Sequence, residues 1–102
     1  DAPGRCLRYR GLTLDPDAVE VRLDGRVLEQ LTAREFELLR ELLSSPGRVF
    51  TREILLAKLW GYDFFGDERV VDSHIKNLRK KLGVDYIETV RGVGYRVPKE
   101  HP

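Results

Sequence analysis

The sequence predicts an α+β domain in which a small antiparallel sheet is followed by three helices and a C-terminal β-hairpin. Short alternations of apolar and polar residues fill positions 5–31, which is typical of strands. Three amphipathic stretches with helix-capping signals come next, and two strand-like segments around a glycine-containing tip follow them. A length of 102 residues suits one domain with one hydrophobic core.

Residues that favour turns separate the N-terminal strands. Gly11 and the run 15–17 divide the first three segments, and Asp24-Gly25 suits a two-residue hairpin because both positions tolerate a positive φ. We expect Cys6 to be a small buried residue of the first strand. The expected strands are 6–9, 12–14, 19–23 and 27–31.

The first helix is expected from Thr32 to about Ser44. Thr32 is an N-cap residue, and Glu35 three positions later completes a capping box. The run 45–47 ends the helix because its proline disfavours helical backbone in the residue before it. The apolar face of this helix comprises Phe36, Leu39, Leu42 and Leu43.

A short second helix is expected from Thr51 to Trp60, where Gly61 can adopt the left-handed conformation that ends many helices. A loop over 61–67 follows, and the third helix is expected over 68–82. Apolar residues recur on one face of the third helix at spacings of four, three and four: Val71, Ile75, Leu78 and Leu82. The opposite face is polar and holds Arg69, Asp72, Ser73, Lys76, Asn77 and Lys80, with Arg79 and Lys81 along its sides.

Two strands, 86–90 and 94–97, are joined by the tip Arg91-Gly92-Val93 in the last part of the sequence. The net charge of the chain is +1, but it is unevenly distributed. Residues 1–68 carry 10 basic and 13 acidic side chains, whereas residues 69–96 carry 7 basic and 3 acidic ones. A local excess of positive charge over the third helix and the hairpin suits a polyanionic partner.

The composition excludes several other classes of protein. No apolar run is long enough to cross a bilayer or to act as a signal peptide, so a cytoplasmic protein is expected. One cysteine and two distant histidines, His74 and His101, provide no disulfide and no thiolate metal site, and no cofactor is expected. His74 beside the inward stripe is expected to be a packing residue. No phosphate-binding loop and no nucleophile motif supports an enzyme.

The polar face of the third helix carries the types of side chain that recognise DNA. An α-helix fits the major groove, where Asn77 can bond adenine, Asp72 can accept from a cytosine amino group, and Lys76 can bind phosphate or guanine. A narrow minor groove attracts an arginine such as Arg91 at the hairpin tip. The alternatives are a solvated surface helix and a helix that docks an acidic protein partner.

Four stretches, 31–39, 49–55 with 59–60, 71–82 and 89–96, carry a resemblance to a known family. In this order and spacing they resemble the OmpR/PhoB-type effector domain of bacterial two-component response regulators. The resemblance implies a winged helix-turn-helix with a four-stranded N-terminal sheet, three helices and a hairpin wing that closes on a short strand near Arg48-Val49. The expected boundaries are a linker remnant at 1–4 from a longer protein, the domain at 5–98 and a tail at 99–102.

The resemblance also implies roles for individual residues on double-stranded DNA. The third helix enters the major groove and Arg91 the minor groove. Implied base contacts are Asp72, Ser73, Lys76, Asn77 and Arg91. Implied phosphate contacts are Trp60, Arg69, Arg79, Lys80, Thr89 and Tyr95.

Partners are implied as well. The loop 61–67, with Tyr62, Phe64 and Phe65, matches the segment that family members use to engage RNA polymerase. At least one ring of the phenylalanine pair is expected to pack against the core instead. A receiver domain phosphorylated by a sensor kinase belongs to the intact protein, which is expected to bind direct repeats as a head-to-tail dimer. The isolated domain is expected to be a monomer.

Overall fold

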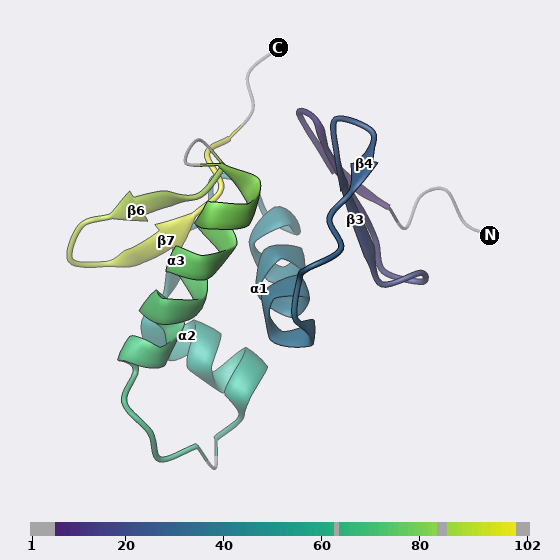
Figure 1. Ribbon diagram of the computed structural model, residues 1–102. Coiled ribbons are helices and arrows are strands. Elements are labelled where there is room, and N and C mark those ends of the chain that lie inside the picture. The colour runs from purple at the N-terminus through teal and green to yellow at the C-terminus, as the bar shows by residue number, and fades with distance from the viewer. Residues whose placement is uncertain (1–5, 63, 84–85, 100–102) are drawn as a thin grey trace.

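A computed structural model describes residues 6–62, 64–83 and 86–99. It confirms the expected α+β winged helix-turn-helix: helix α1 lies between an N-terminal sheet on one side and helix α3 with the hairpin wing on the other (Figure 1). The expected linker remnant at 1–4 and tail residues 100–102 lie outside the described residues. Among the helices that the structure describes, none has the length and apolar character needed to cross a membrane.

The N-terminal sheet has four antiparallel strands in the order β1-β2-β3-β4. Asp24 and Gly25 form the expected two-residue turn between β3 and β4, with φ angles of 52° and 85°. Leu23 pairs directly with Arg26 across this turn. The strands are β1 (Leu7–Tyr9), β2 (Leu12–Asp15), β3 (Glu20–Leu23) and β4 (Arg26–Val27).

Two expectations for this sheet are wrong in detail. Cys6 is not a buried strand residue: it precedes β1 and is partly exposed, because strand pairing begins at Leu7, opposite Leu14. The fourth strand does not extend over 27–31. It ends at Val27, because the chain must leave the sheet to reach the cap of helix α1 at Thr32.

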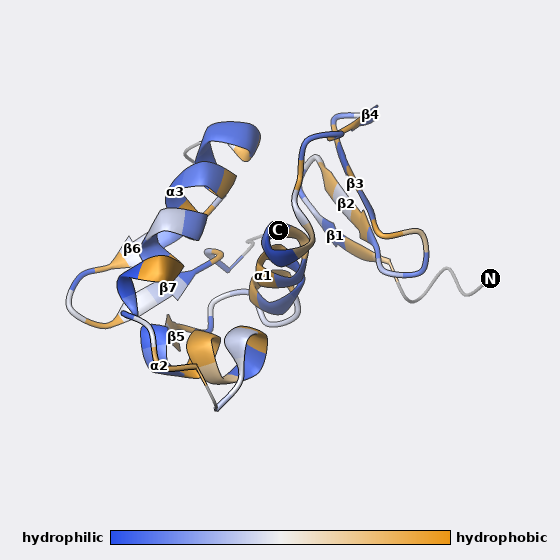
Figure 2. Cartoon of the chain, turned by 60° about the horizontal axis from the view of Figure 1, so that its bottom comes forward, coloured by the Kyte–Doolittle hydropathy of each residue, from blue (hydrophilic) through white to orange (hydrophobic). Residues whose placement is uncertain are grey.

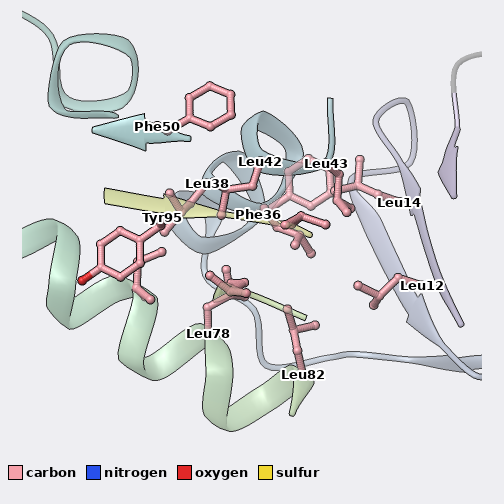
Figure 3. Packing of buried hydrophobic residues seen from close by; sticks show 14 of the residues in the cluster. Leu12, Leu14, Phe36, Leu38, Leu42, Leu43, Phe50, Leu78, Leu82 and Tyr95 are labelled. Atoms are coloured by element: carbon pink, nitrogen blue, oxygen red, sulfur yellow. The ribbon is translucent and has the colours of Figure 1, made fainter. Parts of the chain in front are cut away.

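Helix α1 (Ala33–Leu43) is the centre of the core. Its capping box is present as expected: the Glu35 amide donates to Thr32 Oγ1 at 3.1 Å, and the Thr32 amide donates to Glu35 Oε1 at 3.0 Å. Side chains from the N-terminal sheet, such as Leu12 and Leu14, and from α3, such as Leu78 and Leu82, converge on the space beside α1 (Figure 3). The fully buried members from these three elements include Leu12, Leu14, Leu38, Leu39, Leu42 and Leu78.

The helix-turn-helix follows α1. Strand β5 (Phe50–Thr51) leads into α2 (Arg52–Leu55), with the expected Thr51 as N-cap. The last turn of the second helix is a π-helical segment, η2 (Leu56–Trp60), in which the Gly61 amide donates to the Leu56 carbonyl at 2.9 Å. Helix α3 (Arg69–Leu82) then begins within one residue of the expected position and ends at Gly83, which has a φ of 106°.

The wing consists of β6 (Glu88–Val90) and β7 (Gly94–Arg96), and β7 pairs with β5 to give the order β5-β7-β6. The hairpin closes on a short strand as the resemblance implied, and this strand, Phe50–Thr51, directly follows Arg48-Val49. Gly94 allows this approach, because a Cβ atom there would lie 2.1 Å from the Phe50 carbonyl oxygen. This pairing attaches the wing to β5, the strand that directly precedes helix α2 in the chain.

Candidate nucleic-acid interface

Helix α3 separates its apolar and polar residues as the sequence predicts. Val71, Ile75, Leu78 and Leu82 are buried against the rest of the core. Apart from the half-buried Val70, the other residues of the helix are polar or charged, and hydrophilic and hydrophobic colours alternate along α3 in Figure 2. Its outer face, the five exposed residues opposite the buried stripe, consists of Arg69, Ser73, Lys76, Asn77 and Lys80.

Most side chains of the outer face have no partner among the residues that the structure describes. Ser73, Lys76, Asn77 and Lys80 make no side-chain hydrogen bond or ion pair to any described residue. Their donors and acceptors are therefore available to a ligand. Arg69 is the exception on this face.

Arg69 pairs with Asp67 at the start of the helix. The distance between Arg69 Nη2 and Asp67 Oδ2 is 2.7 Å. This contact lowers the pKa of Asp67 and raises the pKa of Arg69. Both side chains are exposed, so water screens the pair and an anion can compete for the guanidinium group.

The flank of α3 that faces the wing carries two paired residues. Asp72 accepts hydrogen bonds from Arg52 Nε of α2 at 2.9 Å and from the Tyr95 hydroxyl of β7. Burial and the bond to Asp72 raise the pKa of Tyr95, while the bond to Asp72 raises the pKa of Arg52. Asp72 was expected at a base, and in this structure it joins α3 to both α2 and the wing.

Arg79, the second paired residue, is held by strand β6. Its guanidinium donates to the Ile87 carbonyl at 2.9 and 3.1 Å and to Thr89 Oγ1 at 2.6 Å. The same group lies 5.7 Å from the centroid of the Tyr95 ring. Arg79 and Thr89, both expected at phosphates, therefore also bond to each other.

The opposite flank of α3 packs toward α1. Lys81 Nζ lies 2.6 Å from Glu35 Oε1 and donates to the Gln30 carbonyl at 2.6 Å. Burial raises the pKa of Glu35, but the hydrogen bonds from Lys81 and from the Thr32 amide outweigh this effect and hold it below 4.5. Sequence analysis placed Lys81 at the side of the helix without finding this partner.

His74 and Trp60 pack together on the same flank. The His74 ring meets the Trp60 ring edge-on at 5.0 Å, and His74 Nδ1 lies 2.9 Å from the Val70 carbonyl. His74 is thus a packing residue, as expected. Arg34 covers the Trp60 ring at 4.7 Å. Within the described ranges no three His, Cys, Asp or Glu side chains gather where they could hold a metal ion.

The loop before α3 exposes two of its three aromatic side chains. Tyr62 is 91% exposed and Phe65 is 97% exposed. Phe64 is half-buried, with its ring centroid 6.3 Å from that of Trp60. One ring of the phenylalanine pair is thus partly covered by Trp60, but neither ring belongs to the hydrophobic core, where at least one was expected to pack.

The wing tip presents Arg91 to solvent. The Val93 amide donates to the Val90 carbonyl at 2.9 Å, and Gly92 adopts a φ of 76°, so the tip is a tight turn. Arg91 is exposed and pairs with no described residue. A second cation near the wing, Arg52, was missed by sequence analysis. Its partners Asp72 and Glu68 are distant in sequence, and no local pattern reveals them.

Comparison with known proteins identifies relatives of this chain. The family model described as "Transcriptional regulatory protein, C terminal" matches residues 26–97. Regulatory protein VanRB of Enterococcus faecalis is 52% identical over 90 residues, which cover 88% of this chain and 40% of the relative. Transcriptional regulatory protein CseB of Streptomyces coelicolor is 48% identical over 94 residues, which cover 92% and 40%. The chain therefore spans about 40% of the length of these curated relatives.

Solved structures show the same fold. The DNA-binding domain of Klebsiella pneumoniae RstA, crystallised with the RstA box, is 35% identical with a TM-score of 0.82, covering 92% of this chain and 97% of that one. The Thermotoga maritima response regulator DrrB, an OmpR/PhoB homologue, is 35% identical with a TM-score of 0.83, covering 93% of this chain and 45% of that one. With these matches and a family model that spans most of the chain, the protein belongs to the C-terminal domain family of OmpR/PhoB-type transcriptional regulatory proteins.

Proposed function

We propose that this chain is the sequence-specific, double-stranded DNA-binding domain of a response regulator that controls transcription. Helix α3 lies in the major groove and the wing tip Arg91 lies in the minor groove. The observation that carries the proposal is the outer face of α3, where Ser73, Lys76, Asn77 and Lys80 are exposed and lack partners among the described residues. Beside this face the wing ends in Arg91, a cation that also has no described partner. We assign no catalytic step to the domain.

The outer face divides into base contacts and phosphate contacts. Ser73, Lys76 and Asn77 are placed to meet base edges, with Asn77 suited to adenine and Lys76 to guanine or phosphate. Arg69 and Lys80 contact phosphates on either side of the groove, as charged residues commonly do in such complexes. Trp60, Thr89 and Arg79 lie at the edges of this surface, where phosphate contacts can supplement the pairs that they already make.

A salt titration of duplex binding tests this proposal. For roughly four to seven phosphate contacts, the logarithm of the affinity should fall with the logarithm of salt at about −0.9 per contact. Binding that ignores salt, or tight binding to an acidic protein in place of DNA, would contradict the proposal in favour of a protein-docking helix.

Two charge-reversal variants on different surfaces, compared by their duplex affinity, test where the DNA binds. Lys76→Glu changes the net charge on the outer face of α3, and Arg22→Glu makes the same change on the N-terminal sheet, where Arg22 pairs with Glu20. We expect Lys76→Glu to weaken binding by roughly tenfold or more, because it places a like charge against the phosphates. Arg22→Glu should change the affinity by less than about twofold. Equal losses would place the duplex elsewhere.

The exposed loop aromatics suggest a contact with RNA polymerase. Isolated apolar side chains on the surface are common, but two nearly fully exposed aromatic rings in one short loop favour a protein partner. Phe65→Ala in the intact regulator should lower activated transcription and leave duplex affinity unchanged. Val19→Ala, which trims an exposed apolar residue on the N-terminal sheet side, is the matched control.

The remaining proposals concern the intact protein. We propose that a receiver domain precedes this chain and is phosphorylated by a sensor kinase in the cytoplasm. Phosphorylated protein binds direct repeats as a head-to-tail dimer, and the isolated domain is a monomer. Two tandem half-sites would raise the affinity through effective concentration. Sedimentation of the isolated domain, with and without a two-site duplex, tests the stoichiometry.

A further inference from the structure

Three side chains from three separate elements meet at the wing-facing flank of α3. Asp72 Oδ1 accepts a hydrogen bond from Arg52 Nε of α2 at 2.9 Å and a second one from the Tyr95 hydroxyl of β7. Figure 3 shows the Tyr95 oxygen directed toward the α3 ribbon. We call Arg52, Asp72 and Tyr95 the wing latch.

The latch engages one of the two carboxylate oxygens of Asp72 and places a cation beside it. Both donors bond to the same atom, Oδ1, and Arg52 neutralises the charge of the carboxylate. Asp72 also precedes Ser73 of the outer face by one residue, which places it about 100° around the helix from Ser73, on the side of the wing. Its position and its partners both differ from those of the unpaired outer-face residues.

The sheet that holds the wing is small, so a side-chain contact adds to its restraint. Strands β6 and β7 have three residues each, and β5 pairs with β7 only at Tyr95 and Gly94. The tip residue Arg91 has no described partner that could fix it. Tyr95 is only 7% exposed, so a bond between its hydroxyl and α3 restrains β7 from inside the fold.

We propose, on the basis of the proposed function, that Asp72 is a positioning residue rather than a base contact. Through Tyr95 and Arg52 it fixes the angle between α3 and the wing, so that Arg91 meets the minor groove while α3 occupies the major groove. Holding both elements in the bound arrangement beforehand lowers the ordering cost of binding.

A second attachment makes the latch testable without loss of the wing. Arg79 bonds to the Ile87 carbonyl and to Thr89, and neither contact involves the Tyr95 hydroxyl. Tyr95→Phe removes only that hydroxyl and keeps the buried ring. The variant should therefore fold, with a wing whose direction is less restricted, and its unfolding midpoint serves as the check.

Double-mutant cycles measure the effect on the wing tip. In the 102-residue chain, Arg91→Ala should weaken binding to a selected duplex by roughly tenfold. In the Tyr95→Phe and Asp72→Ala backgrounds, the same substitution should cost at least about threefold less, because the tip is no longer held at the minor groove. The Ser73→Ala background is the control, and there the two losses should multiply within about twofold, as for independent sites.

The outcomes separate the inference from the proposed function. Selection from random duplexes should return the same preferred sequence for Asp72→Ala as for the unmodified chain. A changed preference at one base pair, or a coupling below about threefold in either cycle, overturns the positioning role while DNA binding stands. An unmodified chain that binds no duplex overturns the proposed function, and the inference with it.

Discussion

The outer face and the two flanks of helix α3 contain the same kinds of side chain in different surroundings. On the outer face, Lys76 and Lys80 point to solvent and pair with no described residue. On the flanks, Arg79 bonds to strand β6 and Lys81 bonds to Glu35 of α1. All four are cations within six consecutive residues.

The difference shows that pairing, and not charge alone, separates the binding surface from the scaffold. A cation whose donors are already used inside the protein contributes to the fold first. A cation without a partner in the protein is hydrated, and it can displace condensed counterions from DNA when it contacts a phosphate. Substitutions on the flanks should therefore affect stability, and those on the outer face should affect binding.

The largest effect on stability is expected for Glu35→Ala. Glu35 is only 3% exposed, and its loss removes both the capping box of α1 and the partner of Lys81. The free energy of unfolding should fall by about 2 to 4 kcal/mol, since a partly buried ammonium group is left without its carboxylate. Chemical denaturation measures this loss, and a loss below about 1 kcal/mol would show that the flank pair does not stabilise the fold.

The contribution of Glu35 should also depend on pH. Its pKa in the folded protein lies below the ordinary value of 4.5, so the stabilisation is present above that value and is lost as the pH falls through the lower, folded-state pKa. Glu35→Gln is the matched variant, because it keeps the shape and removes the titration. The difference in stability between the unmodified chain and the Glu35→Gln variant should shrink in acid, whereas a constant difference would contradict this assignment.

Asn77→Ala should give the largest effect on specificity. Asn77 is exposed on the outer face, and its amide can make two hydrogen bonds to adenine. Its removal should cost about 1 to 3 kcal/mol at one base pair and relax the preference there. Binding-site selection with the variant measures this change, and an unaltered sequence preference would remove Asn77 from the base contacts.

Local patterns in the sequence predicted most of the fold because their physical causes are local. The capping box at Thr32, the turn at Asp24-Gly25 and the buried stripe of α3 each depend on residues within a few positions of one another. The π-helical turn η2 was not predicted, and a single expected helix became two segments. Its hydrogen-bond pattern depends on packing that adjacent residues do not determine.

The candidate site was predictable in its residues but not in their pairing. Sequence periodicity separated the outer face of α3 from its core face. It could not show that Arg52 lies beside Asp72, or that Lys81 lies beside Glu35, because these contacts join residues 20 and 46 positions apart. Tertiary packing alone distinguishes the wing latch from the outer face.

Lys80→Ala should give a smaller effect that is the same for every sequence. Because Lys80 is exposed and unpaired with any described residue, its loss should make the salt slope shallower by about 0.9, the equivalent of one phosphate contact. The preferred sequence should not change. Lys58→Ala, which removes a cation of η2 that pairs with Glu41, is the control and should leave the slope as it is. Equal slopes for the Lys80 variant and the unmodified chain would remove Lys80 from the interface.

The smallest effect is expected for the stability of the Lys76→Ala variant. This variant tests the prediction that outer-face residues affect DNA binding and not the stability of the fold. Lys76 has no described side-chain partner, and alanine favours helix at least as well as lysine. The free energy of unfolding should stay within about 0.5 kcal/mol of its original value, while duplex affinity falls. A destabilisation comparable to that of Glu35→Ala would mean that Lys76 belongs to the scaffold, since only a side chain with a structural role can cost the fold that much when it is removed.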